Sequence, residues 1–105
     1  MLTLLNSAVI TAPGTYRLAP LSVETARRLV RARPWQSAIG HAATAQLVSE
    51  LLGLSVPWRR IAYRQEIGAD ALVFRLDRRA PEGVVLTRAE IEEAGYGWTL
   101  LTRLA

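Results

Sequence analysis

The sequence predicts an α/β fold of the mixed α+β type, with one mixed sheet of about four to five strands and about three flanking helices. Three observations predict it. Short apolar segments alternate with segments of helical periodicity along the chain. Neither a repeat nor a linker divides the 105 residues, so we expect a single domain over residues 1–105. Half of the residues are hydrophobic, which suffices for one small core.

The chain is expected to begin with a strand, a helix and a second strand. Residues 2–5 hold three leucines and Thr3 and predict a short buried strand. A turn at residues 12–15 leads toward a helix that Ser22 is placed to cap and Pro34 ends. The apolar residues of this helix recur at helical spacing: Val23, Ala26, Leu29 and Val30. Residues 35–39 predict the second strand.

The middle of the chain predicts a helix followed by a hairpin. The helix covers residues 40–52, and Gly53 is a natural stop for it. Strands are expected around residues 60–66 and 71–76, because both segments are bounded by turn residues. Residues 67–70 lie between them, so the two strands are expected to pair.

The last part of the chain predicts a loop, a helix and a closing strand. Residues 78–83 form an exposed loop with a proline and a glycine. Thr87 and Glu90 have the spacing of a capping box, in which each side chain satisfies a free backbone amide of a helix start. The helix is expected to end at Gly95, and residues 98–104 to form the closing strand.

The composition of the chain excludes some classes of function and favours others. All 13 basic residues are arginines, against 9 acidic residues, for a net charge of +4. Arginine pairs with phosphate oxygens, so anionic partners are one interpretation, and a coding bias toward arginine is the other. Cysteine is absent, which excludes disulfides, thiolate nucleophiles and cysteine-based zinc sites. Apolar stretches fall short of the ~20 residues that cross a bilayer, and signal-peptide features are missing, so a cytoplasmic location is expected.

His41 is the candidate for proton transfer. One histidine and two aspartates make a metal site unexpected, and no glycine-rich phosphate loop occurs. His41 lies at the predicted start of a helix, where free amides bind anions, and Gly40 permits close approach of a ligand. A partly buried histidine bonded to a backbone carbonyl is the alternative. Clustered arginines and Glu82 either line the same pocket or are ordinary solvated charges.

Residues 37–47, from Ser37 to Leu47, resemble the signature of the type III anti-CRISPR ring nucleases, a small viral and bacterial family formerly grouped as a domain of unknown function. Residues 4–7 and 51–53 resemble the opening strand of that family and the end of its signature helix. Arg60 and Arg79 fall where the family has two ligand-binding arginines, and residues 81–83 resemble its glutamate-containing loop. The resemblance covers nearly the whole chain.

The resemblance implies a homodimer that binds cyclic tetra-adenylate, a second messenger of type III CRISPR systems, at the dimer interface. It implies cleavage without metal or cofactor to linear di-adenylate ending in a 2′,3′-cyclic phosphate, which switches off the CRISPR effectors. It implies a prokaryotic cytoplasm as the location, with the protein encoded by a virus or by the cell itself. Neither a membrane nor DNA or long RNA is an expected stable partner.

The resemblance also implies residue roles. His41 would be the general acid, and Glu82 would position the ribose or the acid. Arg60 and Arg79 would hold phosphates. The ring would be fixed by a further set of ligand-binding residues: Asn6, Ser7, Ser37 and the amides around Gly40.

Two positions depart from the family pattern. Family members carry a serine two residues after the histidine, where this chain has Ala43. Some have a serine in the first loop, where this chain has Val9. Each departure removes a hydroxyl that could contact ribose or phosphate.

Two other function classes compete with the nuclease. A binding protein would sequester the messenger without cutting it. A basic nucleic-acid-binding regulator would use four arginines in or next to the first predicted helix: Arg27, Arg28, Arg31 and Arg33. Helix-turn-helix spacing and an aromatic RNA platform are both missing from the sequence.

Overall fold

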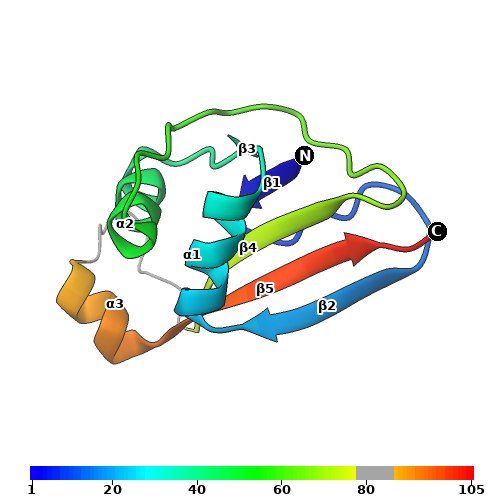
Figure 1. Ribbon diagram of the computed structural model, residues 1–105. Coiled ribbons are helices and arrows are strands. Elements are labelled where there is room, and N and C mark those ends of the chain that lie inside the picture. The colour runs from blue at the N-terminus through cyan, green and yellow to red at the C-terminus, as the bar shows by residue number, and fades with distance from the viewer. Residues whose placement is uncertain (78–86) are drawn as a thin grey trace.

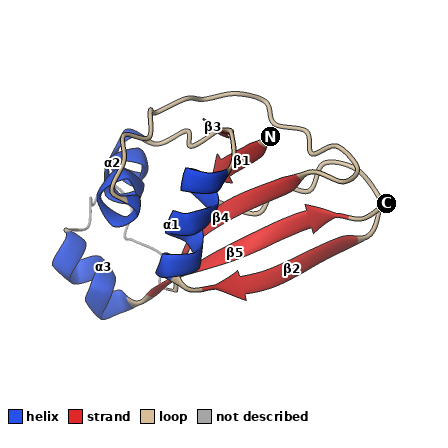
Figure 2. Ribbon diagram, viewed as in Figure 1, coloured by secondary structure: helices blue, strands red, loops and turns tan. Residues whose placement is uncertain are grey.

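The computed structural model describes residues 1–77 and 87–105, and it shows a five-stranded mixed sheet with helices packed on one face (Figure 1, Figure 2). The predicted fold class is therefore confirmed. The strands are β1 (Leu2–Leu5), β2 (Tyr16–Leu21), β3 (Trp35–Ser37), β4 (Asp70–Leu76) and β5 (Tyr96–Arg103). The helices are α1 (Val23–Ala32), α2 (Ala42–Leu52) and α3 (Arg88–Ala94). The predicted loop at residues 78–83 lies outside the described residues.

The strand order is β2-β5-β4-β1-β3. β1 runs parallel to both of its neighbours, β3 and β4, and β5 is antiparallel to β4 and β2. A strand inside such a sheet is covered on both faces, which explains why all four residues of β1 are buried. The leucine-rich start of the chain is thus the inner parallel strand of the sheet.

The main core lies between the sheet and the helices. Leu4, Leu72 and Trp98 point toward α1 and α2 from three adjacent strands and are almost fully buried. Phe74 packs against Trp98 at a ring-centroid distance of 5.2 Å. A smaller apolar cluster covers part of the opposite sheet face, and its buried members are Leu5, Ala38, Ala71, Val73 and Leu101.

The helix signals of the sequence are confirmed. The Oγ of Ser22 accepts a hydrogen bond from the Thr25 amide at 3.1 Å, and Thr87 and Glu90 form the complete capping box. Gly53 ends α2 with a φ of 71°, a left-handed conformation that glycine adopts at low cost. Among the described helices none is long and apolar enough to span a membrane.

The predicted strand at residues 60–66 is wrong. Both edges of β4 are already occupied, by β1 and β5, so a hairpin partner for β4 has no free edge. The segment instead runs irregularly from α2 back to the start of β4 (Figure 1). Buried Gln65 fastens it, because its side-chain amide donates to the carbonyls of Ala69 at 2.8 Å and Leu101 at 2.7 Å.

β2 is a strand that the sequence analysis did not predict. Pro20 argues against a strand because it cannot donate a ladder hydrogen bond. β2 lies at the edge of the sheet, however, and pairs only with β5, with Pro20 opposite Thr99. An edge strand tolerates a proline because one side of its backbone has no partner strand. Smaller differences concern boundaries: β3 ends at Ser37, and β5 begins at Tyr96.

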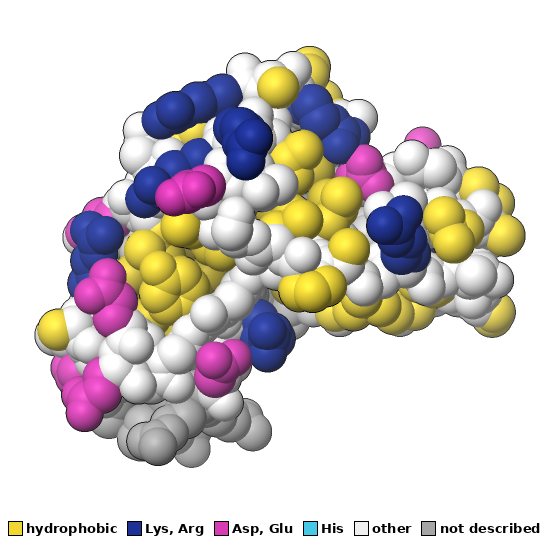
Figure 3. All heavy atoms as spheres, turned by 60° about the horizontal axis from the view of Figure 1, so that its bottom comes forward, with side chains coloured by type: hydrophobic (Ala, Val, Ile, Leu, Met, Phe, Trp, Pro, Cys, Tyr) yellow, Lys and Arg dark blue, Asp and Glu magenta, His cyan; other side chains and the backbone are white. Residues whose placement is uncertain are grey.

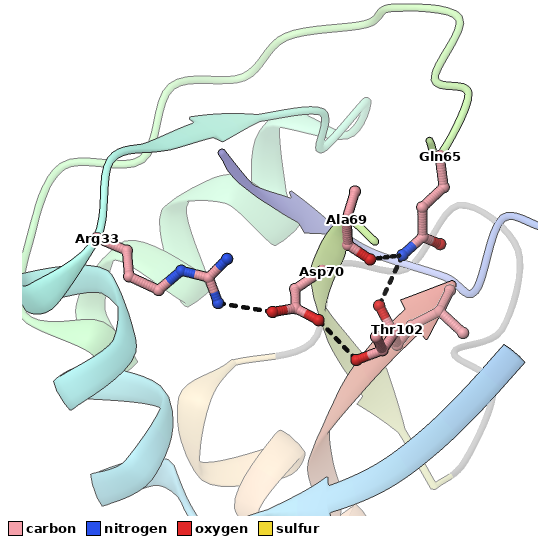
Figure 4. A network of polar contacts seen from close by, with 6 residues as sticks. Arg33, Gln65, Ala69, Asp70 and Thr102 are labelled. Atoms are coloured by element: carbon pink, nitrogen blue, oxygen red, sulfur yellow. Dashed lines mark hydrogen bonds and ion pairs between the residues drawn. The ribbon is translucent and has the colours of Figure 1, made fainter. Parts of the chain in front are cut away.

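Asp70 joins α1 to the sheet at the start of β4 (Figure 4). Its carboxylate accepts hydrogen bonds from Arg33 at 2.8 Å and from Thr102 at 2.6 Å. Burial by itself would raise the pKa of Asp70, but the Thr102 hydroxyl and the Arg33 guanidinium outweigh burial and hold the pKa below its ordinary value. The charged form is therefore favoured in the folded protein.

We expect this carboxylate to contribute stability at neutral pH and to lose it in acid. Because the pKa is lower in the folded than in the unfolded chain, the contribution is present above about pH 4 and disappears as the pH falls through the folded pKa. Asp70→Asn should lower the free energy of unfolding at pH 7 by about 1–2 kcal/mol. Below about pH 4 the variant should lose less of its free energy of unfolding than the wild type does. Urea unfolding at pH 7 and pH 3 measures both effects.

Asp77→Asn is the matched control, since Asp77 and its partner Arg75 are about half exposed. It should unfold at nearly the wild-type urea concentration. Equal destabilisation by the two variants would contradict a special role of Asp70.

Candidate functional site

The predicted site residues that the structure describes gather at one end of the sheet, where β1 and β3 terminate. β1 and β3 are parallel, so their carboxyl ends meet at the same edge. Asn6 and Ser7 follow β1 directly, and residues 38–41 follow β3. The Ala38 amide donates to the Leu4 carbonyl at 2.9 Å, which keeps the two exits side by side. Ligands commonly bind outside the carboxyl ends of parallel strands.

His41 is the N-cap residue of α2. Its backbone is extended, with φ at −125°, and its carbonyl accepts the first helical hydrogen bond, from Ala45, at 3.0 Å. Within the described part of the chain its side chain makes no capping hydrogen bond, and it is exposed. The alternative of a partly buried, carbonyl-bonded histidine is therefore wrong.

The first turn of α2 presents free amides beside the His41 imidazole. The amides of Ala42, Ala43 and Thr44 have no acceptor within the helix, because a helix leaves its first N–H groups unpaired. The helix dipole adds positive potential at the same point. The His41 imidazole thus lies next to a helix start that attracts anions.

Arg60 lies against Gly40, which is the residue immediately before His41. The amide of the preceding residue, Arg59, donates to the Ile39 carbonyl at 2.9 Å and fixes the chain there. A Cβ placed on Gly40 would lie 3.4 Å from the Arg60 Cγ, so the arginine stem packs directly over the glycine. The structure therefore brings Arg60 to the helix start that carries His41.

Ser37 is buried, whereas a residue that contacts a ligand is expected at the surface. It is 2% exposed, and its Oγ accepts a hydrogen bond from the Ile39 amide at 3.3 Å. The hydroxyl thus shapes the turn between β3 and His41 from inside. The structure supports a role in positioning the turn and offers no surface of Ser37 to a ligand.

Asn6 and Ser7 border a groove of about 290 Å³ on the sheet face that the helices leave open. The groove crosses three strands, and Leu18, Val73 and Thr99 also line it. Its wall includes Arg75, a residue that the sequence analysis did not single out from the other arginines.

A larger cavity of about 460 Å³ lies at the opposite end of β1, where Met1, Thr3 and Gln36 border it. Its lining includes none of the predicted site residues. The site residues thus point to the edge with His41 rather than to this cavity.

The remaining predicted positions divide into two groups. Arg79 and Glu82 lie outside the described residues. Ala43 is exposed in the first turn of α2, whereas Val9 packs against the smaller apolar cluster and so has a role in the fold. Among the described residues, no group of three acidic, histidine or cysteine side chains has a geometry that could hold a metal ion.

The arginines of α1 do not form a free basic face. The Nε of Arg27 donates to the Leu51 carbonyl at 2.8 Å, and Arg33 pairs with Asp70. On the face shown in Figure 3, arginine and acidic side chains are interspersed. Two of the four arginines that a nucleic-acid-binding helix would use therefore serve contacts within the fold.

Comparison with known proteins identifies the family. Residues 2–98 match the STIV B116-like family model. The uncharacterized protein YddF of Bacillus subtilis (strain 168) is 36% identical over 102 residues, which cover 95% of this chain and 94% of that protein. The uncharacterized protein ORF117 of Acidianus two-tailed virus is 32% identical over 110 residues, 99% and 94% of the respective chains. B116 of Sulfolobus turreted icosahedral virus has a similar structure, with a TM-score of 0.78, 25% identity and coverage of 96% and 97%. The chain therefore belongs to the STIV B116-like family.

Proposed function

We propose that the protein is a metal-independent ring nuclease that cleaves cyclic tetra-adenylate to linear di-adenylate with a 2′,3′-cyclic phosphate. The observation that carries the proposal is the exposed His41 at the start of α2, with Arg60 packed beside it over Gly40. The family assignment is consistent with it, because the STIV B116-like family includes the anti-CRISPR ring nuclease.

In the proposed reaction a ribose 2′-hydroxyl attacks the neighbouring phosphorus and releases its proton to solvent. The bond to the 5′-oxygen breaks, and the protonated His41 imidazole donates its proton to that oxygen. Arg60 and the first amides of α2 would stabilise the charge that gathers on the phosphate oxygens in the transition state. Asn6 and Ser7 would hold the ring at the adjacent strand exit.

A homodimer suits this substrate. A ring of four equal nucleotides has two-fold symmetry, so a two-fold dimer would present one His41 to each of two opposite phosphates. We propose that the ring lies at the dimer interface in a prokaryotic cytoplasm, where either a virus or the cell encodes the protein. Light scattering of the purified protein at micromolar concentration tests the dimer.

The direct test is incubation of the protein with cyclic tetra-adenylate in EDTA, with products separated by chromatography. The expected product is di-adenylate with a cyclic phosphate end. Tight binding without product would support the sequestering protein instead. Absence of both binding and cleavage would contradict the proposal.

Arg60→Ala should weaken binding of cyclic tetra-adenylate and slow its cleavage. Loss of one charge-assisted contact with phosphate is expected to reduce affinity about 10–100-fold. Calorimetry on the His41→Ala background, which is expected to cleave the ring far more slowly, measures the affinity. Arg28→Ala, at an exposed position of α1, is the control and should bind as the parent does. Equal affinities of all three proteins would remove Arg60 from the site.

A further inference from the structure

The side chain of Arg75 lies over the start of β5. Gly97 leaves open a space in which a Cβ would lie 2.7 Å from the Nη2 of Arg75. At Gly95 a Cβ would lie 2.5 Å from the Oδ2 of Asp77. Arg75 and Asp77 are paired across this space, with 3.1 Å between Nη1 and Oδ1. The absence of side chains at the two glycines therefore leaves room for the guanidinium of this exposed arginine, and one carboxylate pairs with it.

Arg75 forms part of the wall of the groove that Asn6 and Ser7 border. The rest of the lining is mainly apolar, with Leu18 and Val73 from two strands. At about 290 Å³ the groove lies at the small end of ligand sites, whose volumes run from about 300 to 1,000 Å³. It has room for one heteroaromatic ring and is too small for a whole cyclic oligonucleotide.

We propose that this groove binds one adenine base of the cyclic ligand and that Arg75 stacks on that base. The inference rests on the proposed function and extends it to the recognition of a base of the ligand. Apolar walls with a few polar atoms suit the face and edge of a purine. Single-stranded nucleic acids are commonly bound by stacking of bases on aromatic rings or on the plane of an arginine.

A base fits this environment better than a phosphate does. Asp77 lies 3.1 Å from the Arg75 guanidinium and repels a second anion, which weakens Arg75 as a phosphate ligand. The same carboxylate orients the guanidinium and leaves its stacking ability intact. The continuity of the groove with Asn6 and Ser7, at the strand exit beside His41, connects a bound base to the reacting part of the ring.

The test uses cyclic tetra-adenylate in which one adenine is replaced by 2-aminopurine, a base whose fluorescence falls when it stacks. Binding is measured on the His41→Ala background, so that the ring stays intact. Arg75→Ala should lower the affinity about 10-fold or more and reduce the quenching. Arg75→Lys should not restore either quantity, because lysine keeps the charge but lacks the plane.

Two further variants separate the possible causes. Gly97→Ala places a methyl group where Nη2 lies, so it should reduce quenching although Arg75 is still present. Arg17→Ala, on a side chain that alternates to the other face of β2, should behave like the parent. Circular dichroism tests whether each variant is folded.

The outcomes distinguish this inference from the proposed function. If the wild-type protein neither binds nor cleaves the ring, both are overturned. If it cleaves the ring and Arg75→Ala leaves affinity and quenching unchanged, only the base site is overturned. Restoration by Arg75→Lys would identify a phosphate contact, and this result too would overturn the base site.

Discussion

Replacing His41 with alanine is expected to slow cleavage of cyclic tetra-adenylate about 10²–10⁴-fold while affinity stays close to that of the wild type. The variant would lose the proposed proton donor for the departing 5′-oxygen. It keeps Arg60 and the first amides of α2, which in the proposed site would contact the ligand independently of the imidazole. Single-turnover cleavage with excess enzyme measures the chemical step, and calorimetry measures the affinity.

Gln46→Ala is the matched control for this variant. Gln46 is exposed on the same helix, more than one turn beyond His41, and its loss should leave the single-turnover rate unchanged. Undiminished cleavage by His41→Ala would remove the general acid from the mechanism. A parallel loss of binding and rate would instead assign His41 to ligand binding.

Leu72→Ala is expected to destabilise the fold by about 2–5 kcal/mol. Leu72 is fully buried in β4, pairs in register with Leu4 of β1 and faces the main core between sheet and helices. Truncation removes apolar contacts and leaves a cavity that the surrounding strands cannot close. A domain of this size has only about 5–15 kcal/mol of stability, so a large part of it would be lost.

Leu18→Ala provides the comparison, because the same atoms are removed from a side chain that is 55% exposed on the edge strand β2. Its cost should be well under that of Leu72→Ala. Urea unfolding with a common slope for both variants gives the difference. Equal costs would contradict the assignment of the main core to the helical face of the sheet.

The sequence predicted the elements whose signals are local. The caps at Ser22 and Thr87 and the stop at Gly53 depend on residues within four positions of the helix ends, and all three are confirmed. The strand at residues 60–66 was predicted from local composition as well. It failed because strand pairing is decided by distant segments, which already occupy both edges of β4.

The candidate site, like the fold, was predictable where its signals are local and unpredictable where distant segments meet. The position of His41 at a helix start follows from its neighbours in sequence. The placement of Arg60 beside Gly40 depends on a backbone hydrogen bond between Arg59 and Ile39, and no local pattern encodes such a contact. The burial of Ser37 was likewise invisible in the sequence, because it depends on strands from distant parts of the chain. A signal for Arg75 did exist in the two glycines at 95 and 97, which are unusual at the start of a strand.

The inner position of β1 has a consequence for folding kinetics. Thr3 pairs with Ala71, so the sheet closes only when segments nearly seventy residues apart meet. Such non-local pairing slows folding, and during synthesis the first strand emerges long before β4 exists to receive it. Until β4 emerges, the leucine-rich strand β1 lacks one of its two neighbouring strands. Chaperone dependence and early aggregation are therefore expected to respond more strongly to changes in residues 2–5 than to changes in the edge strand β2.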